Sequence, residues 1–354
     1  MKKFYLFFAF IAVVAFGAAC NELPDGDKQQ GEKACVTVKL MSTATKATIE
    51  DTADEAKVSS IQVFVFNGEA IDGYKAAAAA EVSALSVSVD ATAGTRDIWA
   101  FINAPALTGF SSKTEVLNAV SHFADNAADN FVMAGHLDQQ AISAASQVNI
   151  SVDRFAARFR LLKVTRRMTN AALQAVDFEI VRVYLRSVVT NVKYDFGTPT
   201  PYEWISKSFG PVSGRTLATD NPLVYRDLGT PAPVAQGASY ENVIALYAYP
   251  NTHAVDDTPE DREQQTFRRT RLCVDIRIDV DGNGTFSDDE YFTYPVSVGA
   301  VESNKSYEIV ELIITRLGNK NGNDDDITSI AFDVNLVVND WTEVLVGDGG
   351  VFTI

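Results

Sequence analysis

The sequence predicts an all-β protein made of two tandem antiparallel β-sandwich domains with one or two short helices. Short segments whose apolar residues alternate with a period of two recur along the chain, and turn-rich loops separate them. This succession is typical of a β-sandwich and differs from the strand–helix alternation of an α/β nucleotide-binding fold. The predicted strands are Cys35–Leu40, Ile61–Phe66, Leu85–Val89, Ile98–Phe101, Val148–Val152, Phe155–Val164, Phe178–Leu185, Val243–Tyr249, Leu272–Val280, Tyr291–Val298, Ser306–Ile314, Ala331–Val338 and Val344–Val346.

A change in composition near Ser151–Arg154 marks the predicted boundary between the two domains. The chain of 354 residues is long enough for two hydrophobic cores. Arginines at alternate positions of a strand either face solvent or pair with acidic neighbours, and the acidic composition favours ion pairs. The arginines that follow the boundary are Arg154, Arg158, Arg160, Arg166 and Arg167.

One helix is predicted among the strands of the first domain. Ser112 and Glu115 have the spacing of a capping box. The alanine run Ala76–Ala80 fits either a helical turn or a loop. The apolar residues expected on one face of the first helix are Val116, Leu117, Val120 and Phe123.

The first twenty residues have the layout of a lipoprotein export signal. Lys2 and Lys3 precede the apolar run Phe4–Phe16, and small residues lead to Cys20. Signal peptidase II cuts before such a cysteine, whose thiol then carries a diacylglycerol. The alternative, a transmembrane anchor, needs about 20 apolar residues, more than this run supplies. The polar segment Asn21–Lys33 is typical of a disordered tether.

The charge and the cysteine content exclude some kinds of partner and of covalent stabilisation. The formal net charge of −16 argues against binding nucleic acid or anionic lipid surfaces. Once Cys20 is lipidated, only Cys35 and Cys273 remain, too few for a disulfide framework. One bond between them is an alternative to the favoured interpretation, a buried and inert Cys273.

The sequence carries no catalytic motif. His122, His136 and His253 are isolated from one another, and neither a Gly-x-Ser-x-Gly elbow nor a His-Glu-x-x-His motif is present. Carboxylate pairs distant in sequence are the one arrangement that a motif search does not detect. We therefore expect a protein that is not an enzyme and requires no cofactor.

One loop has the spacing of a calcium site. In the segment Asp279–Glu290, oxygen-bearing residues stand at the ligand positions of an EF-hand loop and glycine stands at the turn position. The flanks are predicted strands instead of helices, so an acidic solvated hairpin loop is the alternative. A bound Ca²⁺ would stiffen the loop. The expected ligands are Asp279, Asp281, Asn283, Thr285, Ser287 and Glu290.

Several motifs, in their order and spacing, resemble the fimbrillins of type V pili, the FimA-type shaft proteins and their relatives. The likeness covers nearly the whole chain. The motifs that carry it are the lipobox at Cys20, Val36–Leu40, Val58–Glu69, Ala93–Arg96 with the strand Asp97–Asn103, Arg154–Phe159, Asn304–Tyr307, Ile314–Thr315, Gly318–Asp326 and Val338–Trp341.

The resemblance implies a transthyretin-like, two-domain protein delivered to the outer membrane as a lipoprotein and then built into a cell-surface fimbrium. A trypsin-like protease removes the N-terminal segment, and a strand from a neighbouring subunit fills the vacated groove. The implied partners are further copies of the chain, accessory fimbrial subunits, outer-membrane lipid through Cys20, and an adhesion target. The implied division is 1–19 signal peptide, 20–46 tether and propeptide strand, 47–152 N-terminal domain, and 153–354 C-terminal domain with a donor-strand tail.

The implied propeptide strand contains Cys35, Val36, Val38 and Leu40, whose alternation suits a strand that fills a sheet. Its removal exposes backbone groups that cost about 1–3 kcal/mol each if buried unpaired, and β-augmentation by another strand satisfies them. We expect the cut between Lys46 and Ala47, with lysine where the family often has arginine.

The expected donor strand is the tail Trp341–Ile354, which has a glycine-rich hinge at Gly347–Gly350. Packing of this tail onto its own domain is the alternative. A tip or anchor subunit, or a surface glycan-binding lipoprotein that does not polymerise, is the alternative function. The expected donor residues are Val344, Val346, Val351, Phe352 and Ile354.

Overall fold

The protein is described by a computed structural model over residues 31–41, 53–209, 214–253, 268–320, 332–341 and 346–347. These residues form several β-sheets with two short α-helices, α1 (Ala79–Ser83) and α2 (Lys113–Asn118), which confirms the predicted all-β sandwich class. No helix within these ranges is both long and apolar enough to cross a membrane.

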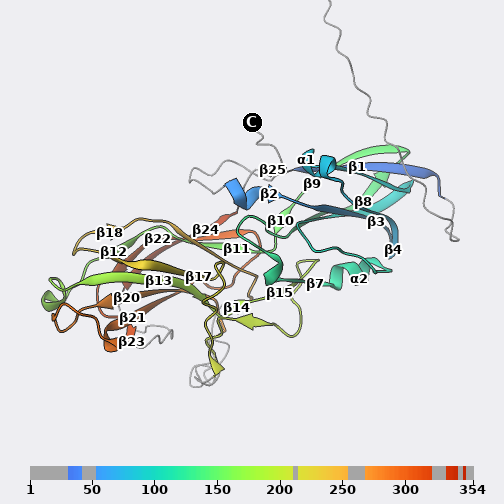
Figure 1. The fold of residues 1–354 in the computed structure, drawn as a ribbon. Helices are drawn as coiled ribbons and strands as arrows, with labels where there is room; N and C mark the ends of the chain where they lie inside the picture. Colours follow the sequence, from blue (N-terminus) through green and yellow to red (C-terminus); the bar gives the residue numbers. More distant parts are fainter. Residues whose placement is uncertain are drawn as a thin grey trace, which may run out of the picture.

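Two sheets are built from the N-terminal half (Figure 1). The first has the order β5-β1-β9 and the second has the order β10-β8-β6-β3-β4. Their facing valines and isoleucines form a core of their own. The strands are β1 (Lys33–Met41), β3 (Ile61–Asn67), β4 (Ala70–Ala76), β5 (Ser86–Thr92), β6 (Gly94–Ile102), β8 (Met133–Ile142), β9 (Ala145–Ser151) and β10 (Asp153–Arg154).

Glycines allow these two sheets to meet closely at two points. A Cβ on Gly73 in β4 would lie 2.3 Å from the carbonyl oxygen of Asp90 in β5. A Cβ on Gly135 in β8 would lie 2.0 Å from that of Ser151 in β9. Both distances are shorter than any non-bonded contact tolerates, so the packing of the sheets requires glycine at both positions.

Two further sheets are built from the C-terminal half (Figure 1). In one, β22 pairs with β11 and β12 on one side and with β24 on the other, while β19 and β18 lie beyond β11 and β12. The other has the order β17-β13-β20-β21-β23. The strands are β11 (Ala157–Leu161), β12 (Val164–Arg166), β13 (Phe178–Arg186), β17 (Tyr225–Pro233), β18 (Ser239–Tyr240), β19 (Ile244–Ala248), β20 (Arg271–Ile278), β21 (Tyr291–Ser297), β22 (Lys305–Ile314), β23 (Asn319–Lys320) and β24 (Phe332–Asp340).

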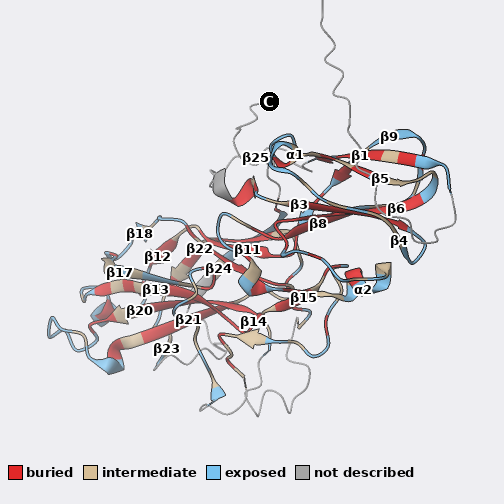
Figure 2. Cartoon of the chain, turned by 45° about the vertical axis from the view of Figure 1, so that its right-hand side comes forward, coloured by how far each residue is buried: buried red, intermediate tan, exposed pale blue. Residues whose placement is uncertain are grey.

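Short elements connect the two halves. Strand β7 (Val120–His122) pairs with β15 (Asn191–Lys193), and β2 (Lys57–Val58) pairs with β25 (Val346–Gly347). A second core runs from the N-terminal sheets through the C-terminal sheets, and Figure 2 shows its buried strands in red. The remaining elements are β14 (Val188–Val189), β16 (Trp204–Ile205) and the 3₁₀ turns η1 (Ala53–Ala56), η2 (Phe123–Asp125), η3 (Ala171–Leu173) and η5 (Asp288–Glu290).

Strand direction departs in part from the predicted antiparallel sheets. Most pairs are antiparallel, but β1 runs parallel to β9, β22 runs parallel to β11 and β12, and β2 runs parallel to β25. Each of these pairs joins segments far apart in the chain, whereas the hairpins are antiparallel. Period-two alternation predicts a strand but not the direction of its partner.

The predicted helix begins where expected and ends early. The Ser112 hydroxyl accepts a hydrogen bond from the Glu115 amide at 3.1 Å, as a capping residue should. Helix α2 stops at Asn118 because the backbone turns extended at Ala119 and Val120 joins β7. The alanine run leads into α1, which starts at Ala79.

Four of the five clustered arginines are buried and Arg167 is exposed. Arg158 and Arg160 form the predicted ion pairs. Arg158 meets Glu55 at 2.6 Å and Arg160 meets Glu308 at 3.2 Å. Arg166 instead donates to backbone carbonyls, including that of Leu173 at 2.8 Å. Cys273 is buried, as favoured, and no disulfide joins it to Cys35.

Candidate functional site

Strand β1, which contains the predicted propeptide strand, is the middle strand of its sheet. On one side it is antiparallel to β5, with Val36 opposite Val89 and Val38 opposite Val87. On the other side it is parallel to β9, where Val38 lies opposite Val148 and Leu40 opposite Ile150. Without β1, the described strands of this sheet would be β5 and β9, which pair only with β1.

The side chains of β1 alternate between core and surface. Val36 and Val38 are completely buried and Leu40 is 7% exposed. Cys35 lies on the opposite face at intermediate exposure, and Met41 at the end of the strand is 48% exposed. The strand therefore fills an apolar groove using aliphatic side chains and backbone hydrogen bonds, with no buried charge on β1 itself.

The predicted lipidation and cleavage residues lie outside the described residues. These residues are Cys20, Lys46 and Ala47. The described chain resumes at the turn η1, so the predicted cut falls between β1 and η1 in sequence. Of the predicted donor residues, Val344, Val351, Phe352 and Ile354 also lie outside the described ranges. The fifth, Val346, is in β25 and pairs with Lys57 of β2.

A buried polar cluster lies where the two halves of the molecule meet. We call Glu55, Arg154, Arg158, Tyr247 and Trp341 the junction cluster. The Glu55 carboxylate accepts hydrogen bonds from Arg158 Nη1 at 2.6 Å and from the Tyr247 hydroxyl, and Arg154 Nη2 donates to the Glu55 carbonyl at 3.1 Å. Both guanidinium groups lie over the Trp341 ring, at 4.5 and 5.0 Å from its centre.

Sequence reasoning missed the role of Glu55 in this cluster. Arg154, Arg158 and Trp341 stand in recognisable motifs, but Glu55 lies in a polar stretch without a pattern. Its partner Arg158 is more than a hundred positions away along the chain. The available signal was an arginine at a buried strand position, because a buried guanidinium requires an acidic or polar partner nearby.

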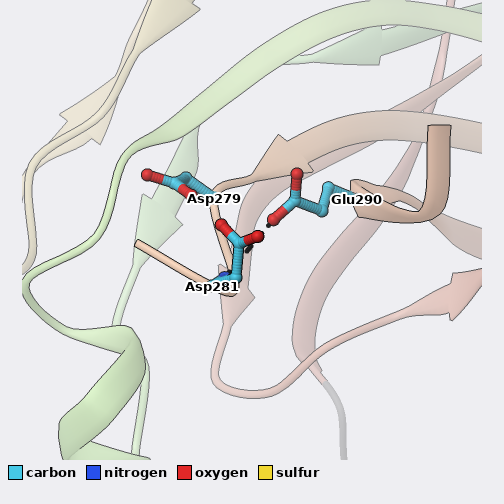
Figure 3. A group of neighbouring side chains, drawn as sticks. All are labelled: Asp279, Asp281 and Glu290. Carbon is cyan, nitrogen blue, oxygen red and sulfur yellow. Dashed lines mark hydrogen bonds between the residues drawn. The ribbon is translucent and has the colours of Figure 1, made fainter. Parts of the chain in front are cut away.

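The predicted calcium loop lies between β20 and β21. Asp279, Asp281 and Glu290 each offer a carboxylate oxygen, and these oxygens all lie within 4.8 Å of one another. Figure 3 shows the carboxylates of Asp281 and Glu290 facing one another across the loop. The flanks are strands, so the loop closes a hairpin instead of joining two helices. The predicted ligand positions 1, 3 and 12 therefore converge.

Backbone amides organise this loop and favour charged carboxylates. Burial alone would raise the pKa of Asp279, but the amides of Gly284 and Asn283 outweigh it and the pKa is lowered. The amide of Ser287 lowers the pKa of Glu290. Both groups are therefore ionised at neutral pH, the form that binds a hard cation.

The other three predicted ligands support the loop. Asn283 Oδ1 accepts a hydrogen bond from the Thr285 amide at 2.7 Å, and Asn283 Nδ2 donates to Asp281 Oδ2 at 2.7 Å. The Ser287 hydroxyl donates to Glu290 Oε2 at 3.0 Å. All six residues thus lie in one loop, and the convergence of ligand oxygens is established for the three carboxylates.

Comparison with solved structures defines the class of the fold. A fimbrilin (fimA) from Porphyromonas gingivalis W83 is 18% identical, with 89% of this chain and 99% of that chain covered and a TM-score of 0.66. A candidate cell adhesion protein from Bacteroides eggerthii DSM 20697 is 17% identical, with coverages of 91% and 100% and a TM-score of 0.62. The chain therefore has the β-sandwich fold of these proteins.

A family model matches the N-terminal half of the chain and the start of the C-terminal half. The model described as major fimbrial subunit protein (FimA) matches residues 34–173, which span β1, the rest of the N-terminal sheets and the start of the C-terminal half. Residues 34–173 are therefore similar to this family, in agreement with the resemblance of the sequence to the fimbrillins. The family consists of structural fimbrial subunits and not of enzymes. No curated protein matches the sequence.

Proposed function

We propose that this chain is the precursor of a fimbrial subunit that loses β1 by proteolysis and then polymerises by strand exchange. The observation that carries the proposal is the position of β1, a middle strand that connects to the rest of the fold through one segment only. That segment contains Lys46 and Ala47. One cut there separates a whole strand from the sheet.

The physical consequence of the cut is an unfilled groove. Each fully buried Val or Leu side chain contributes about 1.5–3 kcal/mol to the stability of the fold. The loss of Val36, Val38 and Leu40 therefore destabilises the subunit. Loss of β1 also removes hydrogen-bond partners from both β5 and β9. A strand with the same alternation from a second subunit restores both contributions by β-augmentation.

The C-terminal tail is the proposed source of that strand. Its residues Val344, Val346, Val351, Phe352 and Ile354 supply apolar side chains around a glycine-rich hinge. The pairing of β25 with β2 involves only two residues on each strand.

The first residues complete the proposed pathway. The export signal and Cys20 suit delivery to the outer membrane as a lipoprotein, and a trypsin-like protease that cuts after Lys46 would release the subunit from its lipid. The subunit would then enter a cell-surface fimbrium with further copies and accessory subunits. Its adhesion target is not specified by these residues.

Limited trypsin digestion of the lipid-free precursor tests this proposal. N-terminal sequencing should find a product that starts at Ala47, and electron microscopy should show filaments that resist SDS. A precursor cut cleanly at this bond that stays monomeric would favour a tip, anchor or glycan-binding lipoprotein instead.

As a second proposal, the Asp279–Glu290 loop binds Ca²⁺ and stiffens the β20–β21 hairpin. The convergence of three carboxylate oxygens from positions 1, 3 and 12 of the calcium-loop pattern favours it. Neighbouring carboxylates repel one another without a cation, which gives the ion a favourable role. Calorimetric titration with Ca²⁺ should detect binding at one site, which Glu290→Ala should abolish.

A further inference from the structure

The segment that follows the proposed cut changes its surroundings when the subunit matures. In the precursor, η1 and β2 are tethered at their N-terminal side by the chain that leads to β1. At their other flank, β2 pairs with β25 in the C-terminal tail, and Figure 1 shows these two strands side by side. Cleavage removes the first constraint, and departure of the tail removes the second.

The junction cluster still binds this segment afterwards, together with Asn103, which donates to the Lys57 carbonyl. None of its five residues lies in β1 or in the tail beyond Trp341. Glu55 is 3% exposed and is bound through its side chain to Arg158 and Tyr247 and through its carbonyl to Arg154. The bound groups come from β10, β11 and β19, which belong to both halves of the molecule.

The same cluster fixes the start of the tail. Trp341 is 1% exposed, and its ring contacts Phe131 and Tyr247 with centre distances of 5.2 and 5.7 Å. Its amide donates to the Asn304 carbonyl at 2.8 Å, and its carbonyl accepts from Arg154 Nη1 at 3.5 Å. A tail that moves to another subunit therefore starts from a fixed point after Trp341.

We infer that the junction cluster is the anchor that keeps residues 53–58 folded against the subunit once β1 and β25 have both left. This inference rests on the proposed strand exchange, because only there do both neighbours leave. Glu55 is its positioning residue. It holds residues 53–58 against the arginines and the tyrosine that also contact Trp341, where the tail begins. The cluster should matter little in the precursor and strongly in the matured, tail-released subunit.

Lys57 provides a direct measure of this anchoring. Its side chain is 41% exposed and lies 3.7 Å from Asp129, while its neighbour Val58 is completely buried. The Lys57 carbonyl accepts a hydrogen bond from Asn103 Nδ2 at 2.8 Å. Trypsin can cut after Lys57 only when residues 53–58 come away from the subunit, so the rate of this cut reports how often the anchor opens.

The experiment compares wild type, Glu55→Gln and Glu308→Gln in the lipid-free chain, each with and without the tail Val344–Ile354. Glu308→Gln is the matched control because it removes the other buried carboxylate partner of β11, the one that pairs with Arg160. With the tail deleted, Glu55→Gln should accelerate cleavage after Lys57 by about tenfold or more, measured by mass spectrometry. The control should stay within about twofold of wild type.

Equal cleavage rates in the two variants, or no added effect of tail deletion in Glu55→Gln, would overturn the inference. If Glu55→Gln does not fold, Tyr247→Phe replaces it, since that change removes one hydroxyl donor and keeps the ring packing on Trp341. The measurement needs no filament, so failed polymerisation leaves it readable and refutes only the proposed function.

Discussion

Two strands occupy equivalent positions in the two halves of this molecule, and they differ in what binds them. Strand β1 is parallel to β9 and antiparallel to β5, and β22 is parallel to β11 and β12 and antiparallel to β24. The buried residues of β1 are aliphatic: Ala34, Val36, Val38 and Leu40. Strand β22 buries Glu308 against Arg160 and carries Ser306, which accepts from Arg158 Nε at 3.2 Å.

This difference teaches which strand can be exchanged. Backbone hydrogen bonds and small aliphatic side chains can be supplied by any strand with the right alternation. A buried ion pair depends on its particular partner, and loss of one partner costs about 3–5 kcal/mol. The aliphatic β1 therefore suits the proposed exchange, whereas β22 depends on its ion-pair partner Arg160.

Deleting Val344–Ile354 should have the largest effect, because it removes the proposed replacement for β1. The deleted chain should fold, be cut after Lys46 and fail to form any polymer. Analytical ultracentrifugation of the cut protein would measure this loss. Unfolding of the deleted chain would show that the tail belongs to the core of its own domain, and the replaceable strand would need another source.

Assembly should also be blocked when the groove is kept filled, that is, when β1 is not removed. Lys46→Ala should leave a full-length lipidated monomer, because β1 stays in its groove and no edge is free for a second subunit. Lys57→Ala is the matched control, since Lys57 is the next basic residue after Lys46. The Lys57→Ala protein should still be cut after Lys46. Immunoblots of surface fractions would separate the two, and normal polymer from Lys46→Ala would remove this residue from the pathway.

Cavity-forming substitutions in β1 and β22 should affect the stability of the matured protein differently. Val38→Ala should destabilise the precursor by about 2 kcal/mol, and Leu312→Ala in β22 by about 2–5 kcal/mol. In the proposed polymer β1 has left, so Val38→Ala should then match wild type while Leu312→Ala should remain less stable. Guanidinium unfolding of precursor and polymer would measure both. A Val38→Ala polymer as weak as its precursor would mean that β1 is still present.

Much of this fold was predictable because the buried faces of its strands are regular. The segment Cys35–Leu40 was predicted and lies inside β1, and the calcium-loop pattern correctly brought Asp279, Asp281 and Glu290 together. In both cases the signal is local, since spacing along the chain fixes which side chains share a face or a turn.

Other elements depend on partners that no local pattern reveals. Strand β8 was missed because its second half, around Asp138 and Gln139, is polar and half-exposed, and it is a strand because β6 pairs with it. The burial of Glu55 was missed for the same reason, since it is set by Arg158 and Tyr247. Long-range pairing decides these positions.

The smallest predicted effect concerns the Asp279–Glu290 loop, which lies in the permanent C-terminal half. Calcium at a hundredfold excess over its dissociation constant stabilises a folded protein by about 2.7 kcal/mol, a rise in melting temperature of several degrees at about 2–4 °C per kcal/mol. The rise should occur in wild type and in Asp288→Ala, whose carboxylate is exposed and stands at a position without a ligand role. Glu290→Ala should lose it, because Glu290 supplies the converging carboxylate of the last position. Scanning calorimetry of the precursor with calcium or with a chelator decides this, and equal shifts in both variants would place any bound calcium elsewhere in the chain.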